Sequence, residues 1–360
     1  MTRSQVVVWP ENSIADRQWM LDNFPGASGA IVMLAEKIDA ELLNAAGPQL
    51  KVISTMSVGY DHVDLATIGK RVADLTVMLA LMAGRNVKET ISLVNNGLVR
   101  PQRDNLILSL TLTNTPEKWP TTTWAPFAFC GPQFSASCVA PGRTAGFIGF
   151  GRIAQATLAR LIPFGYKECI YITRSTSSRD PASDTKLAQE LGLNSVRRVT
   201  LDELAAQSDV LFVLAPGGPA TYHMVNESFL KKMKKTAVLV NTARGTLVDS
   251  DALVKALDEG YIYAAGLDVV EGEPQIPLDH PLVKHPRCII LPHIGSATTD
   301  TRVGMAKLAV NNLLGGLFDQ PMPAELKIVC GAQLGFELGA ELGMAKVTTN
   351  SYAMKVWKQR

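Results

Sequence analysis

The sequence predicts an α/β protein with a doubly wound parallel sheet and a second, smaller α/β domain. From residue 144 onward, short apolar runs alternate with helical patterns, a rhythm that produces parallel strands joined by right-handed crossovers. A glycine-rich turn follows the first of these runs, and charged residues follow later ones. Because ligands bind outside the carboxyl ends of such strands, this half of the chain is expected to carry the functional site.

Size and composition narrow the class of protein. A chain of 360 residues with 47% hydrophobic residues is long enough for two well-cored domains. Its net charge of +2 provides no field that would hold nucleic acid or an acidic membrane, so neither is an expected partner. The apolar runs are well short of the ~20 residues that span a bilayer, and the first residues lack the form of a secretory signal. The five cysteines lack zinc-ligand or redox spacing, which favours reduced thiols and a cytoplasmic location.

Each element of the carboxyl-terminal half follows from the spacing of its apolar residues. Continuous apolar runs predict buried parallel strands, and patterns with a period near 3.6 predict helices. The strands are expected at 144–148, 168–173, 209–214, 236–241, 263–269 and 288–291. The helices are expected at 153–162, 201–207, 226–233, 249–257 and 299–317.

The amino-terminal part is a smaller and less regular layer. The same patterns predict strands at 6–9, 30–34 and 51–56 and a helix at 39–46. Two helical patterns, 63–69 and 72–82, then follow each other directly, where a doubly wound unit has a strand between its helices. This domain is therefore expected to lack a strand. The uncharged β-forming run at 106–113 also has no place in the rhythm.

A dinucleotide-binding motif follows the first strand of the regular half. Gly149, Gly151 and Ala154 form the pattern G-x-G-x-x-A between a predicted strand and a predicted helix. The first glycine permits a tight turn, the second lets the backbone approach a pyrophosphate, and the alanine lets the helix pack on the strand. Free N–H groups at the helix start, around Gly151, Arg152 and Ile153, are expected to bind the phosphates. A glycine-rich turn without a ligand is the alternative, and the position of the motif favours a Rossmann-type site.

The next strand bears on the choice of nicotinamide cofactor. About 20 residues after the motif, an NAD-binding chain usually presents an acidic residue to the ribose 2′-hydroxyl. This chain has Thr173, Arg174 and Ser175 there, and no carboxylate. Arg174 and Ser175 suit a 2′-phosphate, with Arg179 as a further cation, so we expect NADPH, with NADH as the alternative. A solvated cation at the strand end is the other interpretation of Arg174.

Three charged residues stand in a fixed order after later strands. Arg244 follows the run at 236–241, Glu273 follows the run at 263–269, and His293 follows the run at 288–291. Reduction of a 2-keto acid needs a cation for the carboxylate or the keto oxygen, which a guanidinium provides, and a proton donor, which an imidazole provides. A carboxylate bonded to the imidazole fixes its tautomer and favours its charged form. Each residue alone could be structural, but the set in this order predicts an active site.

The other histidines have no such company in the sequence. His62 and His223 stand apart from the three charged residues, and His280 and His285 lie around Pro281, where we expect solvated side chains. No group of residues has metal-ligand spacing, so no metal is expected.

These motifs together resemble the D-isomer-specific 2-hydroxyacid dehydrogenase family, and within it the branch that acts on glyoxylate and hydroxypyruvate. The resemblance covers residues 5–97 and 119–328. It rests on the segments 51–59, 149–155, 241–245, 266–274, 291–298 and 321–327.

The resemblance implies roles for particular residues. It implies Arg244, Glu273 and His293 as catalytic residues, and backbone N–H groups of Val58 and Gly59 as ligands of the substrate carboxylate.

Cofactor contacts and assembly are implied in the same way. Asp268 would contact the nicotinamide carboxamide, and Thr221 would line the cofactor pocket. Family members are usually dimers, which implies a homodimer here, and Trp124 lies in a segment that resembles a dimer contact, with a packed loop aromatic as the alternative.

The implied activity is NAD(P)H-dependent reduction of a small 2-keto acid, glyoxylate or hydroxypyruvate, to glycolate or D-glycerate. One alternative is another family activity, of the phosphoglycerate or D-lactate dehydrogenase type. The other is a cofactor-sensing relative without catalysis.

The resemblance also implies a domain division, with departures from the family. Residues 1–71 with 298–328 would form a flavodoxin-like substrate domain, 72–297 the dinucleotide-binding domain, with 98–118 as an atypical insertion, and 329–360 an extra tail. The substrate domain is short of family segments before Val6 and between Arg71 and Val72, so it is apparently truncated. Either a misjoined coding sequence or genuine divergence explains this. Because a lost strand exposes apolar surface and unpaired ladder groups, we expect poor folding or weak activity despite intact site residues.

Overall fold

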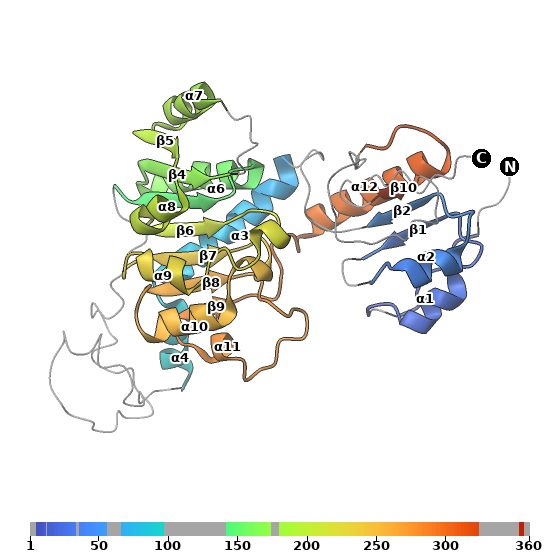
Figure 1. Cartoon of the computed structure of the whole chain (residues 1–360), viewed down its shortest axis with the longest axis horizontal. Coiled ribbons are helices and arrows are strands. Elements are labelled where there is room, and N and C mark those ends of the chain that lie inside the picture. The colour runs from blue at the N-terminus through green and yellow to red at the C-terminus, as the bar shows by residue number, and fades with distance from the viewer. Residues whose placement is uncertain are drawn as a thin grey trace. The chain divides into compact units, whose positions relative to one another are not determined.

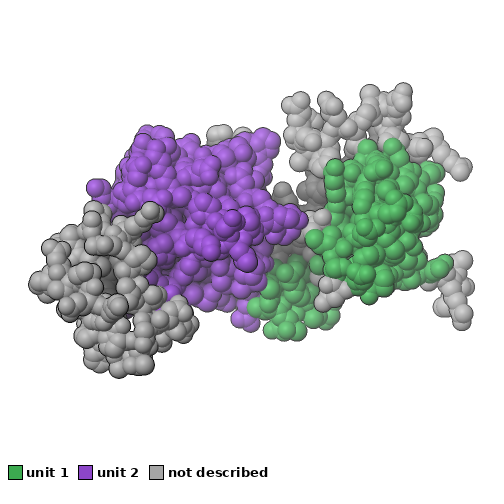
Figure 2. All heavy atoms as spheres, turned by 90° about the horizontal axis from the view of Figure 1, so that it is seen from below, with its two compact units in different colours: residues 1–68, 296–360 green, residues 69–295 purple. Residues whose placement is uncertain are grey.

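The polypeptide divides into two units, which are described separately. Unit 1 comprises Met1–Ile68 and Ser296–Arg360, and unit 2 comprises Gly69–Gly295 (Figure 2). The structure is a computed structural model. It describes residues 5–11, 13–33, 36–55, 66–96, 142–173, 180–323 and 353–355.

Unit 2 is built on a seven-stranded parallel sheet with the order β5-β4-β3-β6-β7-β8-β9 (Figure 1). The strands are β3 (Thr144–Ile148), β4 (Glu168–Ile172), β5 (Ser195–Arg198), β6 (Val210–Val213), β7 (Val238–Asn241), β8 (Ala264–Leu267) and β9 (Cys288–Ile290). The chain runs outward from β3 to β5, returns to β6 beside β3, and continues to β9. This is the predicted Rossmann-type topology, and the reversal between β3 and β6 is where such sheets bind ligands.

Helices cover both faces of this sheet. Those of unit 2 are α3 (Ala66–Gly84), α4 (Val87–Asn96), α6 (Arg152–Leu161), α7 (Pro181–Leu191), α8 (Leu201–Gln207), α9 (Glu227–Lys232), α10 (Ser250–Asp258) and α11 (Pro281–Lys284). Phe147 and Phe212 belong to one core with residues of α3 and α6, whereas their neighbours Ile148 and Val213 belong to a second core with residues of α8, α9 and α10. Successive strand residues face opposite layers, so both faces are buried and the strand sequences are continuously apolar.

Helix starts in unit 2 are marked by polar side chains. Asp180, Asn226 and Asp249 each accept a backbone N–H of the first turn, and Thr200 forms a capping box with Glu203. Helix α6 differs, because its N-cap is a glycine and no side chain caps its first turn. The first backbone N–H groups of α6 can therefore donate to an acceptor outside the helix.

Unit 1 has a three-stranded sheet with the order β1-β2-β10. Its elements are α1 (Arg17–Asn23), β1 (Gly29–Val32), α2 (Ala40–Ala46), β2 (Val52–Thr55), α12 (Thr299–Leu317) and β10 (Ala353–Lys355). Ile53 packs in a core with residues of α1 and α2, and its neighbour Val52 faces α12. A Cβ on Gly316 would lie 2.7 Å from the Cβ of Val52, so only glycine allows α12 to pack this closely.

Three differences from the predicted elements have physical reasons. The predicted strand at 6–9 is wrong: Val6 and Val8 are exposed, and the described part of unit 1 pairs no strand with them. A β-forming run becomes a strand only where a sheet edge pairs with it. From Ala66 onward, the two predicted helical patterns at 63–69 and 72–82 form one helix, α3. Strand β5 was not predicted because Val196 is its only buried residue, so it has no apolar run.

Candidate active site

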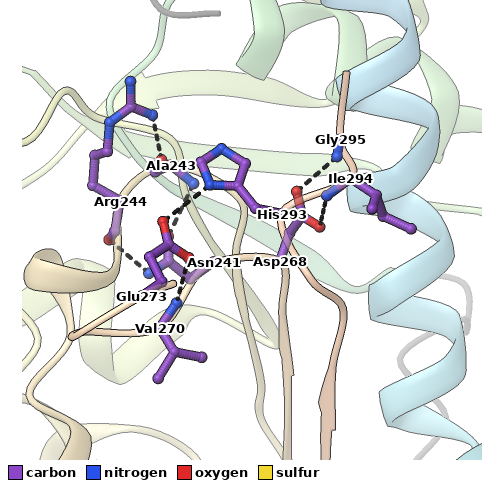
Figure 3. Close-up of polar contacts among 9 residues, drawn as sticks. All are labelled: Asn241, Ala243, Arg244, Asp268, Val270, Glu273, His293, Ile294 and Gly295. Carbon is purple, nitrogen blue, oxygen red and sulfur yellow. Dashed lines mark hydrogen bonds and ion pairs between the residues drawn. The ribbon is translucent and has the colours of Figure 1, made fainter. Parts of the chain in front are cut away.

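The predicted site residues of unit 2 lie beyond the carboxyl ends of three adjacent strands. Asn241 at the end of β7 is in register with Leu267 at the end of β8, which is in register with Ile290 at the end of β9. Arg244, Glu273 and His293 each follow one of these strands. The parallel register therefore brings their loops to one edge of the sheet, as Figure 3 shows.

The structure brings His293 and Glu273 into direct contact. The Nδ1 atom of His293 lies 3.0 Å from Oε1 of Glu273, and both side chains are about one-third exposed. The other carboxylate oxygen, Oε2, accepts the backbone N–H of Val270 at 3.3 Å. With Nδ1 facing the carboxylate, Nε2 is the nitrogen left to act on a ligand (Figure 3). A carboxylate held in this way fixes the orientation of the ring.

Asn241 holds the loop that carries Arg244. Its side-chain oxygen accepts the N–H of Ala243 at 3.0 Å, and its side-chain nitrogen donates to the carbonyl of Arg244 at 2.9 Å. Nη1 of Arg244 donates to the Ala243 carbonyl at 2.7 Å, so the guanidinium is anchored at one corner. Nothing in the sequence alone identified Asn241, although an asparagine that ends a buried strand is a polar group requiring a partner.

The next residue, Gly245, packs against the loop after β8. A Cβ on Gly245 would lie 2.2 Å from the carbonyl carbon of Val270. Only glycine permits this approach, which fixes the loop of Arg244 against the turn that carries Glu273.

Asp268 organises the loop of His293. Its Oδ1 accepts the N–H of Ile294 and its Oδ2 accepts the N–H of Gly295, both at 2.8 Å, and its carbonyl accepts the N–H of His293 at 2.9 Å. Burial raises the pKa of this carboxyl above its ordinary value, although the two backbone N–H groups act in the opposite direction. The contact with a carboxamide implied by the resemblance stays a prediction, and the observed partners of Asp268 are backbone groups.

The predicted phosphate loop has the backbone that the motif requires. Gly149 has φ of +86°, and a Cβ there would lie 2.8 Å from backbone atoms of Ala215. At Gly151 an added Cβ would meet nothing within 4 Å, so the space beside the first turn of α6 is open. Ala154 is buried against the sheet, while Arg152 is exposed and Ile153 is half-buried. An uncapped helix end beside an open space fits a dinucleotide pyrophosphate.

Thr221 lies in the loop after β6, beside the reversal of the sheet. Its hydroxyl donates to the carbonyl of Pro216 at 2.9 Å, and Gly218 is a second acceptor at 3.2 Å. It therefore closes this loop on itself. Its predicted place in the cofactor pocket stays a prediction.

Several predicted residues lie outside the described part of the chain. These are Val58, Gly59, Trp124, Arg174, Ser175, Arg179 and the run at 106–113. Their assignments remain those of the sequence.

Two histidines differ from the sequence prediction. His285 is buried, and its Nδ1 accepts the N–H of Arg287 at 3.1 Å, so it is not a solvated loop residue. His223 has carboxylate company after all, because its Nε2 lies 2.8 Å from Oε2 of Glu271. That contact joins residues that are far apart in the sequence, and no sequence motif predicts it.

The described residues contain neither a cluster of metal ligands nor a membrane-spanning helix. Among those residues, no group of three or more His, Cys, Asp or Glu side chains is placed to hold a metal ion. Of the helices that the structure describes, none combines the length and apolar character of a membrane span.

The chain is similar to known dehydrogenases over most of its length. The family model of the D-isomer specific 2-hydroxyacid dehydrogenase NAD binding domain matches residues 121–295. A human glyoxylate reductase/hydroxypyruvate reductase is 41% identical over 317 residues, covering 84% of this chain and 85% of that protein. A glyoxylate reductase of Thermofilum pendens is 36% identical over 330 residues, covering 88% and 85%. The crystal structure of an NADPH-dependent glyoxylate/hydroxypyruvate reductase from Sinorhizobium meliloti, with NADP and malonate, has a TM-score of 0.56 at 29% identity and covers 80% of each chain.

Fold, site and similarity agree on the class of protein. The sheet and its uncapped glycine turn are typical of a dinucleotide-binding domain, and the relatives specify the class of enzyme. The chain belongs to the D-isomer-specific 2-hydroxyacid dehydrogenase family, as the motifs indicated. It is therefore an oxidoreductase of the 2-hydroxyacid dehydrogenase type that uses a nicotinamide cofactor.

Proposed function

We propose that this chain reduces glyoxylate and hydroxypyruvate to glycolate and D-glycerate, with NADPH as the hydride donor. One observation carries the proposal: the 3.0 Å contact between His293 and Glu273 at the edge of the sheet beyond β8 and β9. An imidazole oriented by a carboxylate suits proton donation to a developing alkoxide.

The residues divide the work of the reaction. A dinucleotide held at the glycine turn before α6 would supply the hydride for the keto carbon from its nicotinamide. His293 delivers a proton from Nε2 to the keto oxygen, and Glu273 at Nδ1 orients the ring for this transfer. Arg244 holds the carboxylate or the keto oxygen with its planar fork. Val58 and Gly59, which lie outside the described residues, keep only the carboxylate-binding role that the family resemblance implies for their N–H groups. Asp268 keeps the loop of His293 in place through its two backbone contacts.

The substrate assignment is supported by the relatives that share most of this chain. The human and Thermofilum pendens proteins carry glyoxylate reductase in their names, and the human name adds hydroxypyruvate reductase. Both substrates are small 2-keto acids, which are the acceptors that the guanidinium and imidazole together suit.

NADPH is favoured over NADH by the residues after β4. Thr173, Arg174 and Ser175 provide no carboxylate for a ribose 2′-hydroxyl and provide a cation for a 2′-phosphate. The Sinorhizobium meliloti relative is named NADPH-dependent. Arg174→Ala is expected to raise the KM for NADPH about tenfold, as the loss of one charged hydrogen bond does, with little effect on NADH.

A substrate panel tests the proposal. The purified chain is assayed with glyoxylate, hydroxypyruvate, pyruvate and 3-phosphohydroxypyruvate, each with NADPH and with NADH. Oxidation of NADPH is expected to be fastest with the first two acids. Faster turnover of pyruvate or 3-phosphohydroxypyruvate would assign another activity of the family. Tight NADPH binding with no reduction of any acid would identify a cofactor-binding protein without catalysis.

Assembly and location belong to the same proposal. We expect a homodimer, with Trp124 at or near the contact between the two copies. Light scattering of the purified protein measures the oligomeric state directly. The cysteines that the structure describes, Cys169 and Cys288, are buried and not disulfide-bonded, which fits a reducing compartment such as the cytoplasm. Cell fractionation checks that location.

A further inference from the structure

We infer that His223 is a positioning residue for this reaction: it grips Glu271 and thereby holds the turn that presents Glu273 to His293. This inference rests on the proposed function, because it assigns His223 to the step that His293 performs. His223 is outside the predicted site, and no motif of the family resemblance includes it.

The turn in question carries two carboxylates with separate partners. The N–H of Glu273 donates to the carbonyl of Val270 at 3.2 Å, and Gly272 has φ of +91°, so residues 270–273 form a turn of the type that needs glycine at its third position. Glu271 and Glu273 occupy the second and fourth positions. Glu273 bonds His293 at 3.0 Å, whereas Glu271 bonds His223 at 2.8 Å.

Two side chains hold Glu271 from one direction. Nε2 of His223 contacts Oε2, and the hydroxyl of Tyr222 donates to Oε1 at 3.2 Å. The two rings stack, with centroids 3.9 Å apart and planes inclined by 14°. A bidentate grip by stacked rings restricts the rotamers of Glu271 more than a single surface ion pair does.

His223 is itself fixed to the site's own framework. It has φ of +47°, which is uncommon for a residue with a side chain, and its N–H donates to the carbonyl of Thr246 at 2.9 Å. Asp249, the N-cap of α10, lies 3.7 Å from Nδ1 of the ring. The strained backbone thus aims the imidazole at Glu271, and the bond to Thr246 ties His223 to the segment that follows Arg244 and Gly245.

The backbone of the turn rests on Gly245. An added Cβ on that residue would lie 2.4 Å from the backbone nitrogen of Glu271. The turn is therefore confined by Gly245 at its backbone and by the two rings at its first carboxylate. Release of Glu271 would remove a side-chain anchor of the turn and leave the contact of Glu273 with His293, which is the contact that the reaction uses, less firmly positioned.

Matched variants of His223 test the inference. His223→Leu removes the ring nitrogen, whereas His223→Gln keeps a donor near the Nε2 position, and both place a side chain at the same positive φ. His223→Leu is expected to lower kcat about tenfold with the KM values for keto acid and NADPH nearly unchanged, and His223→Gln to recover most of it. Glu271→Ala, which breaks the same contact from the other side, is expected to match His223→Leu. A rise in KM alone, or kcat within twofold of wild type in both His223→Leu and Glu271→Ala, would overturn the inference.

A double-mutant cycle separates positioning from a general loss of structure. In a Glu273→Gln background, His223→Leu should lower kcat less than twofold, because the carboxylate that it positions is already neutral. An additive tenfold loss would overturn the inference.

A readout without turnover keeps the inference separate from the proposed function. In the protein labelled with ¹⁵N-histidine, the Nδ1 resonance of His293 reports its bond to Glu273. We expect that resonance to shift in His223→Leu and Glu271→Ala and to stay in His223→Gln. An unchanged resonance in both disruptive variants would overturn the inference. Failure of the wild type to reduce any keto acid would instead overturn the proposed function, and the resonance would still decide the role of His223.

Discussion

Two histidines of unit 2 share their local geometry and differ in their surroundings. His223 and His293 have positive φ of 47° and 54°, and their rings contact carboxylates of one turn, Glu271 at 2.8 Å and Glu273 at 3.0 Å. His293 follows β9 at the ligand edge of the sheet, while His223 is stacked on Tyr222 and lies near Asp249. A histidine–carboxylate pair therefore does not define a catalytic group. Its position relative to the strand ends and to Arg244 does.

Arg244, which follows β7 at the same sheet edge as His293, provides the largest expected effect. Arg244→Ala removes the planar fork that holds the keto acid and should lower kcat/KM about 10²–10⁴-fold, with losses in both substrate affinity and rate. Arg244→Lys, the matched variant, keeps the charge and should recover part of the loss, because an ammonium cannot make two parallel bonds. Steady-state kinetics with hydroxypyruvate measures both. Near-normal turnover of Arg244→Ala would remove this residue from the site.

The two carboxylates of the turn provide a matched comparison. Glu273→Gln keeps the size of the side chain but replaces the carboxylate that bonds Nδ1 and orients the ring of His293, so kcat should fall about 10²-fold. Glu271→Gln, which keeps an acceptor for His223, should lower kcat only a few-fold. Measuring kcat for the two variants side by side tests whether the comparison holds. Equal losses would mean that both pairs act in the same way.

Asp268 should have a smaller effect on turnover, because it acts through the backbone of the His293 loop. Asp268→Asn replaces one acceptor by an NH₂ group that faces a backbone N–H, which costs about 1–3 kcal/mol at a buried site. We expect a lower melting temperature and a loss in kcat of about tenfold. Asp249→Asn is the counterpart near His223, and an asparagine serves equally well as the N-cap of α10, so its melting temperature should stay close to wild type. Melting curves that fall equally for both variants would contradict this distinction.

The smallest effect on turnover is expected at Asp209, which supports the sheet far from either histidine pair. Burial alone would raise the pKa of Asp209, but bonds from the Thr144 N–H, Lys234 and Arg143 outweigh it and hold the pKa below the ordinary value of 3.8. Because the folded pKa is lowered, the stabilisation is present above about pH 4 and is lost as the pH falls through the folded pKa. Asp209→Asn should thus lower the free energy of unfolding by about 1–3 kcal/mol at pH 7 and by less near pH 3.

Urea unfolding at the two pH values measures this difference. The control is Asp202→Asn, which breaks an exposed pair with Lys232 and should change the free energy of unfolding by less than about 1 kcal/mol. An Asp209→Asn loss that is as large at pH 3 as at pH 7 would show that the charge of Asp209 is not the cause.

Sequence patterns predicted those strands of unit 2 that are buried on both faces of the sheet. The runs around Phe147, Phe212 and Val240 are continuously apolar because both faces are covered, so their strands could be placed from the sequence. Strand β5 was not predicted because Val196 is its only buried residue. The strand predicted at 6–9 was wrong because β-propensity alone does not provide a neighbouring strand to pair with.

The site was predictable only where strand ends position it. Predicted strands precede Arg244, Glu273 and His293. Parallel register brings the ends of these strands together independently of the loop conformations. The contact of His223 with Glu271 depends instead on a positive φ and on a turn packed against Gly245. Neither feature has a local pattern in the sequence, so the structure was needed to find it.

The same substitution at the two histidines tests the central claim most directly. His293→Gln and His223→Gln each place a glutamine at positive φ next to a carboxylate of one turn. Single-turnover oxidation of NADPH by hydroxypyruvate, followed by stopped flow, should slow about 10²–10⁴-fold in His293→Gln, as loss of a proton donor does, and only a few-fold in His223→Gln. Equal rates for the two variants, or a slower His223→Gln, would contradict the assignment of His293 as the proton donor.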